Sequence, residues 1–124
     1  MTNILVLDDS PEITVLLRMG LERQGFNVTI GRNGAEGLAL LRQRANHPDL
    51  IICNLRMPIM DGYAFLDAIR SQAEWASIPV LVLTALSYEE NRREAFARGA
   101  NAFLPKPFRF DDLNALIGEL GVSA

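Results

Sequence analysis

Five polar residues follow short apolar runs of the sequence, and their side chains suit the binding of a metal ion and of an anion. They are Asp8, Asp9, Asn54, Thr84 and Lys106. Two adjacent carboxylates repel a phosphate unless a cation lies between, and a lysine offers a compact positive charge. Each residue alone has an ordinary role, because aspartate often caps a helix, threonine often ends a strand and lysine is usually solvated. They predict a site only if the fold brings them together.

The apolar runs before these residues have the length of β-strands and alternate with segments that can form helices. We expect strands at Ile4–Leu7, Phe26–Ile30, Leu50–Cys53, Val80–Leu83 and Ala102–Leu104. The first, third and fourth runs are continuously apolar, as burial on both faces of a parallel sheet requires. Helices must therefore cover both faces of the predicted sheet.

The segments between the strands carry helix signals. Ser10 is an N-cap candidate with Pro11 after it, and this first helix is expected to end at Gly25. The other expected helices run from Asn33 to about Ala45, from Gly62 to about Gln72, from Tyr88 to Arg98, and after Asp111 and Asp112. Gly62 is also expected to supply a turn that tolerates positive φ.

This alternation of strands and helices predicts an α/β fold. Five βα units with right-handed crossovers form a doubly wound five-stranded parallel sheet, flavodoxin-like (βα)5, with strand order 2-1-3-4-5. Sites in such sheets form outside the carboxyl ends of the strands, near the point where the strand order reverses. The polar residues that follow the strands are therefore expected to converge.

Length and composition limit what the chain can be. Its 124 residues, 49% hydrophobic and 22% charged, predict one domain over residues 1–124 with a sizeable core. A formal net charge of -3 offers no general attraction to nucleic acid or to an anionic membrane. The single cysteine, Cys53, excludes an internal disulfide, and no apolar run approaches the roughly 20 residues of a membrane span. We therefore expect a cytoplasmic domain.

The segments around the polar residues resemble the receiver domain of two-component response regulators. The matching motifs are Val6–Ser10, Pro48–Pro58, Met60–Gly62, Val82–Ala85 and Lys106–Phe108. In such receivers an aspartate at the end of the third strand accepts a phosphoryl group from a histidine kinase, and the acidic pair after the first strand holds Mg²⁺. The resemblance implies a magnesium site formed by Asp8, Asp9, Asn54 and the backbone carbonyl of Arg56.

The resemblance also implies a conformational switch. Lys106 and Thr84, with Ala85 next to Thr84, would contact the phosphoryl group. Phe103 would rotate inward when Thr84 moves toward the phosphoryl group, and the Lys106–Pro107 bond is expected to be cis. The residue types suit this chemistry, because a hydroxyl and an ammonium can both donate to a phosphoryl oxygen.

The partners implied by the resemblance are proteins. A sensor histidine kinase or a phosphotransfer protein would act upstream. A downstream target would bind the face formed by Tyr88–Arg98, Ala102–Leu104 and the last helix, and a homodimer could use the same face. The domain is expected to signal rather than to catalyse, without contacts to nucleic acid or membrane.

Asn54 departs from the receiver pattern, because it occupies the position of the acceptor aspartate. Its carboxamide has a neutral oxygen and a delocalised nitrogen lone pair, so it offers no carboxylate nucleophile. We expect no phosphorylation at this position and weaker binding of Mg²⁺. Two origins stay open: a deliberate Asp-to-Asn substitution, or a natural receiver that works without phosphate.

Two other functions compete with this interpretation. Haloacid-dehalogenase-like phosphatases also use an aspartate after a strand, but they need an Asp-x-Asp motif where this chain has Asp8, Asp9 and Ser10. A flavin-binding domain of this fold needs a phosphate loop rich in glycine or hydroxyl groups after the first strand. The phosphatase remains the alternative to a receiver.

Overall fold

Parallel strands form one central sheet in this protein. The computed structural model describes residues 1–43 and 47–124. The strands are β1 (Asn3–Leu7), β2 (Asn27–Gly31), β3 (Leu50–Cys53), β4 (Val80–Thr84) and β5 (Ala102–Pro105). They lie in the order β2-β1-β3-β4-β5, which confirms the predicted topology. Each strand begins and ends within one residue of its predicted position.

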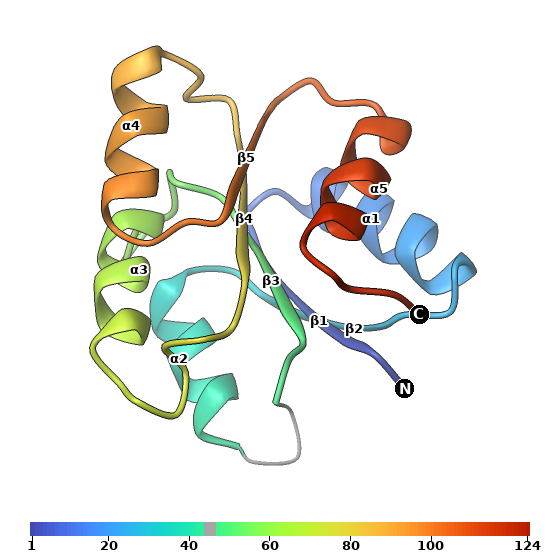
Figure 1. Ribbon diagram of the computed structural model, residues 1–124, viewed down its shortest axis with the longest axis horizontal. Helices are drawn as coiled ribbons and strands as arrows, with labels where there is room; N and C mark the ends of the chain where they lie inside the picture. Colours follow the sequence, from blue (N-terminus) through green and yellow to red (C-terminus); the bar gives the residue numbers. More distant parts are fainter. Residues whose placement is uncertain (44–46) are drawn as a thin grey trace.

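Helices cover both faces of the sheet. They are α1 (Pro11–Arg23), α2 (Gly34–Arg42), α3 (Gly62–Arg70), α4 (Glu89–Ala97) and α5 (Phe110–Glu119). Helices α1 and α5 lie on one face, and α2, α3 and α4 lie on the other (Figure 1). Within the described residues, no helix combines the length and apolar character needed to cross a membrane.

Several helix boundaries differ from the prediction. Helix α1 ends at Arg23 rather than Gly25, and α3 ends at Arg70 rather than near Gln72. Helix α5 begins at Phe110, before the two aspartates after which it was expected. Asp111 and Asp112 instead occupy its first turn, where carboxylates interact favourably with the free backbone N–H groups. Helix α2 ends at Arg42, and the predicted end at Ala45 lies outside the described residues.

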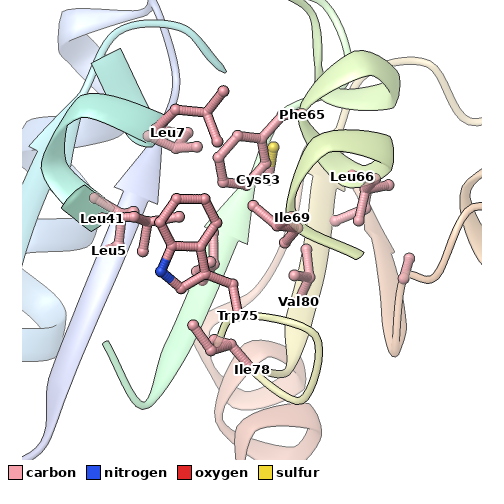
Figure 2. Packing of buried hydrophobic residues seen from close by; sticks show 14 of the residues in the cluster. Leu5, Leu7, Leu41, Cys53, Phe65, Leu66, Ile69, Trp75, Ile78 and Val80 are labelled. Carbon is pink, nitrogen blue, oxygen red and sulfur yellow. The ribbon is translucent and has the colours of Figure 1, made fainter. Parts of the chain in front are cut away.

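Burial on both faces of the sheet divides the core into two layers. Alternate residues of β1 point to opposite faces, so that Leu5 and Leu7 pack under α2 and α3 while Ile4 and Val6 pack under α1 and α5. Figure 2 shows the first layer, in which Phe65 and Trp75 lie over β3. The predicted requirement for helices on both faces is thereby confirmed.

Side-chain caps fix the starts of α1, α2 and α3. The Ser10 hydroxyl accepts from the backbone N–H of Ile13 at 3.4 Å, at the start of α1. Asn33 caps α2 and Asp61 caps α3 through equivalent bonds of 2.9 Å. These caps satisfy N–H groups that a helix otherwise leaves free, and they set where each helix leaves the carboxyl edge of the sheet.

Arg70 links three segments at the edge of the sheet where β4 and β5 begin. Its guanidinium donates to the carbonyl oxygens of Gly99 and Ile78, each at 2.8 Å, and to Oδ1 of Asn101 at 2.9 Å. Burial lowers the pKa of Arg70, and its hydrogen-bond partners within the described residues are neutral oxygens rather than carboxylates. The end of α3, the start of β4 and the turn before β5 are therefore held as one unit.

Ile59 has the only positive φ of a non-glycine residue within the described ranges. Its φ is 69°, and its side chain is 87% exposed in the loop between β3 and α3. The left-handed region is unfavourable for a β-branched side chain, and an exposed side chain recovers little of that cost through packing. The loop therefore carries local backbone strain.

We predict that Ile59→Asn stabilises the protein by about 1 kcal/mol, because asparagine tolerates the left-handed region better than isoleucine. Equilibrium denaturant unfolding measures the change. Ile59→Val is the matched control, since it keeps the β-branch and should give no comparable gain. Equal gains in the two variants would contradict the assignment of strain to the branched side chain.

Candidate functional site

The carboxyl ends of the strands bring the polar residues of the sequence together. A pocket of about 180 Å³ opens there, lined by Asp9, Asn54, Arg56, Thr84, Ala85, Leu86 and Lys106. Asp8 is buried beside the pocket and contacts Lys106. The structure thus places six of the sequence-predicted site residues at this pocket and Asp8 next to it. Phe103 lies apart from its lining and is packed against the core under α3 and α4.

Lys106 and Asp8 form an ion pair that connects the first and last strands. The Lys106 Nζ lies 2.8 Å from Oδ2 of Asp8, and the two side chains are 15% and 3% exposed. The other carboxylate oxygen of Asp8 accepts the backbone N–H of Ser10 at 3.0 Å. Both oxygens of Asp8 are therefore engaged by donors of the protein itself.

Asn54 forms a side-chain hydrogen bond through its amide nitrogen but not through its amide oxygen, within the described residues. Its Nδ2 donates to the backbone carbonyl of Arg56 at 2.9 Å, which fixes the orientation of the amide. Its Oδ1 is buried and has no hydrogen-bond partner among the described residues, although the residue is only 8% exposed. A buried acceptor without a partner raises the free energy of the folded protein. The pocket therefore suits a cation or a hydrogen-bond donor that this oxygen can bind.

Asp9 supplies a free carboxylate at the mouth of the pocket. Its side chain is exposed, and it forms no hydrogen bond or ion pair within the part of the chain that the structure describes. It also lines a larger hollow of about 440 Å³ with Asp8, Arg18 and Arg32. Asp9 is therefore open to a cation from solvent.

These oxygens fit a magnesium ion. Mg²⁺ takes one or two protein carboxylates and several waters, so two aspartates, an amide oxygen and a backbone carbonyl suffice. The described residues contain no group of three or more histidine, cysteine, aspartate or glutamate side chains placed to hold a metal. Oδ1 of Asn54, which has no partner among the described residues, is a neutral oxygen of the kind that can complement the carboxylates of Asp8 and Asp9.

Thr84 connects the pocket to the loop before α4. Its buried hydroxyl oxygen accepts the backbone N–H of Leu86 at 3.2 Å. Its backbone carbonyl accepts the N–H of Lys106 at 2.8 Å. The Lys106–Pro107 bond is cis, as the resemblance implied. A change in the position of Thr84 therefore reaches both the loop after β4 and the residue that carries the ammonium.

Cys53 precedes Asn54 but takes no part in the pocket. It is fully buried, and burial raises the pKa of its thiol far above the ordinary value, with smaller contributions from the carboxylates of Asp8 and Asp61. The neutral thiol is a small apolar group in the core.

Gly62 holds α3 against the backbone of Asn54. Its N–H donates to the Leu55 carbonyl at 2.9 Å, and a methyl group at this position would overlap the Asn54 carbonyl oxygen and approach Cα of Leu55 to 2.8 Å. The sequence-based reason for this glycine was wrong. Gly62 has no positive φ, and the left-handed conformation of this loop falls on Ile59 instead. Glycine is needed here for close approach, a requirement that no local sequence pattern carries.

We predict that Gly62→Ala destabilises the protein by about 2–3 kcal/mol, because the groups that it meets are backbone atoms that cannot rotate away. The side-chain amide signals of Asn54 should also shift in the NMR spectrum. Gly118→Ala is the matched control, since nothing lies within 4 Å of the added carbon. It should raise stability by about 0.5–1 kcal/mol through helix propensity. Equal effects of both changes would contradict the close-packing account.

Comparison with known sequences identifies related proteins. A family model described as the response regulator receiver domain matches residues 4–118. The DNA-binding dual master transcriptional regulator RpaA of Synechocystis is 37% identical over 120 residues, which are 97% of this chain and 49% of the relative. The chain spans about half the length of this and several other curated relatives that it matches.

Comparison with solved structures gives the same family of folds. Chemotaxis protein CheY4 of Vibrio cholerae superposes with a TM-score of 0.88 at 32% identity, covering 97% of this chain and 98% of that chain. The receiver domain of sensor histidine kinase PA1611 of Pseudomonas aeruginosa has a TM-score of 0.86 at 28% identity. Its alignment covers 98% of each chain, and its structure carries a magnesium ion coordinated in the active-site cleft.

Proposed function

Because the chain belongs to the response regulator receiver domain family, we propose that it is a signalling domain that works through protein contacts without being phosphorylated at position 54. The observation that carries this proposal is the carboxamide of Asn54, whose Nδ2 donates to the Arg56 carbonyl. A carboxylate has no N–H to make that bond, so the amide is built into the local structure. We propose that residues 1–124 form one receiver domain.

The absence of a nucleophile follows from the chemistry of the amide. Transfer from a phosphohistidine forms a bond between a carboxylate oxygen and phosphorus while the bond between phosphorus and nitrogen breaks. The side-chain oxygen of Asn54 is neutral. The lone pair of its side-chain nitrogen is delocalised into the carbonyl group, and the N–H of that nitrogen donates to the backbone carbonyl of Arg56. The proposal holds whether the asparagine is a deliberate substitution or natural.

We propose that this pocket can still hold Mg²⁺. We propose Asp8, Asp9, Oδ1 of Asn54 and the Arg56 carbonyl as its ligands, with weaker binding than in a site with a third carboxylate. A bound Mg²⁺ would neutralise negative charge on an anion in the pocket. Thr84, Ala85 and Lys106 would provide hydrogen-bond donors to that anion.

Exposed apolar side chains near the pocket suit an upstream protein partner. Val15, Leu16 and Met19 of α1 are 56%, 47% and 59% exposed, and Val15 lines the hollow that contains Asp8 and Asp9. A sensor histidine kinase or phosphotransfer protein that presents a histidine to the pocket must rest on surfaces of this kind. We propose this partner class for the region around the pocket.

The face formed by α4, β5 and α5 is proposed for a downstream target or a second copy of the chain. Phe103 of β5 is partly exposed there, and the Arg92 guanidinium lies 4.9 Å from the centre of the Phe96 ring. Arginine and aromatic side chains are enriched in protein interfaces.

We propose a cytoplasmic location for these contacts, without binding to nucleic acid or membrane by this domain. Within the described residues no observation favours the phosphatase alternative.

We predict that acetyl phosphate with Mg²⁺ adds no phosphoryl group to this chain and adds one to Asn54→Asp, as measured by intact mass. The restored carboxylate supplies the missing nucleophile. Asn54→Ala is the matched control, since it removes the amide without adding a carboxylate, and it should stay unlabelled. A phosphoryl group found on the chain with Asn54 would overturn the proposal.

Thr84, Leu86 and Phe103 are expected to change conformation once a phosphoryl group can be attached at position 54. In Asn54→Asp, acetyl phosphate should move the NMR signals of Thr84, Leu86 and Phe103, because a phosphoryl oxygen attracts the Thr84 hydroxyl that now accepts from Leu86. The double variant with Thr84→Ala should become labelled while its Phe103 signals move much less. Equal movement in both variants would show that Thr84 does not transmit the change.

A further inference from the structure

We propose that α4 is fixed to α3 at its C-terminal end and is held at its N-terminal end by a latch between Tyr63 and Asn91, so that the helix opens locally from its N-terminal end. The inference goes beyond the proposed function and does not rest on it. The opening needs no phosphoryl group and no metal ion, and it identifies which part of the proposed downstream face can move.

Apolar packing holds α4 at one end only. Its one buried residue, Ala95, and the partly buried Phe96 both lie in its last turn. In the first half of the helix only Asn91 is partly buried, and its neighbours in the helix are exposed. Because burial of apolar surface provides most of the stability of a helix in a protein, the N-terminal half of α4 is weakly attached.

Polar contacts strengthen the C-terminal end. The Arg98 guanidinium forms an ion pair with Asp67 of α3, in which Nη1 lies 2.8 Å from Oδ2. The Arg70 guanidinium donates to the carbonyl oxygen of Gly99 through Nε at 3.0 Å and through Nη2 at 2.8 Å. Asp67, Arg70, Arg98 and Gly99 therefore form an anchor that fixes the end of α4 to α3.

One side-chain pair links the N-terminal half of α4 to α3 within the described residues. Nδ2 of Asn91 donates to the Tyr63 hydroxyl oxygen at 3.2 Å, and this hydroxyl donates to the Asn91 carbonyl oxygen at 3.5 Å. These distances lie at or beyond the upper end of the usual range for such bonds. Tyr88, the N-cap residue, adds no side-chain cap. The latch is therefore weaker than the anchor.

The closed latch also leaves a polar atom unsatisfied. Oδ1 of Asn91 is buried and has no hydrogen-bond partner among the described residues. Opening of the N-terminal half would let water donate to this oxygen, which removes a cost that the closed state carries. The free-energy difference between the closed and open states is therefore smaller than the latch bonds alone would give.

The latch lies between the pocket and the proposed downstream face. Tyr63 directly follows Gly62, which packs on the backbone of Asn54. Asn91 lies in the first turn of α4, after the loop that follows Thr84. Opening of the latch therefore frees the start of α4 from the segment that contacts position 54, while the anchor stays closed.

Native-state hydrogen exchange, measured by NMR on the whole chain, tests the proposal. Tyr63→Phe removes the latch hydroxyl and keeps the ring, whose centre lies 5.1 Å from the Arg98 guanidinium. A released helix end frays, because short helices are unstable in water. The backbone amides of Arg92 and Arg93 should therefore exchange about fivefold faster, the effect of losing one hydrogen bond, while those of Arg98 and Ala100 change by less than about twofold.

Asp67→Asn is the matched control, since it is an equally small change one turn further along α3 and breaks the exposed ion pair of the anchor. Because Arg70 still holds Gly99, exchange at Arg92 and Arg93 should change by less than about twofold. Equal acceleration at both ends of α4 in Tyr63→Phe, unchanged exchange at Arg92 and Arg93, or the same acceleration in Asp67→Asn would overturn the proposal. These rates are measured without phosphate, so the outcome is separate from the labelling of position 54.

Discussion

The ion pair between Lys106 and Asp8 is the interaction around which the functional edge of this molecule is organised. It joins residues 98 positions apart in the sequence, from the ends of β5 and β1, across the edge where β3 and β4 also end. Breaking such a shielded pair leaves a buried charge without a partner, which typically costs several kcal/mol. The pair therefore holds the pocket in one arrangement and decides which oxygens remain free for a cation.

Asn54 complements this arrangement. With an aspartate at this position the pocket would contain a third carboxylate, and the lysine would have two possible partners. The amide removes that choice and uses its own N–H to hold the loop at Arg56. What remains is a neutral oxygen without a partner among the described residues, and an exposed carboxylate at Asp9. The absence of a carboxylate at this position thus removes both a nucleophile and a second possible partner for the lysine.

Much of this fold could be predicted from the sequence, because continuous apolar runs, Ser10 with Pro11 and the positions of glycines are local signals of strands and helices. The convergence of the polar residues followed from the topology. The start of α5 was misplaced because aspartates are good N-caps as well as good first-turn residues. The strain at Ile59 and the close approach at Gly62 depend on how the loop after β3 meets α3. The pairing of Lys106 with Asp8 depends on distances that no spacing in the sequence encodes.

The central claim is that the carboxamide of Asn54, held by its bond to the Arg56 carbonyl, leaves this pocket without a nucleophile. Incubation of the unmodified chain with acetyl phosphate and Mg²⁺, followed by intact-mass measurement and peptide mapping, tests this claim most directly. The account predicts that the mass stays unchanged. A phosphoryl group located at position 54 would contradict it.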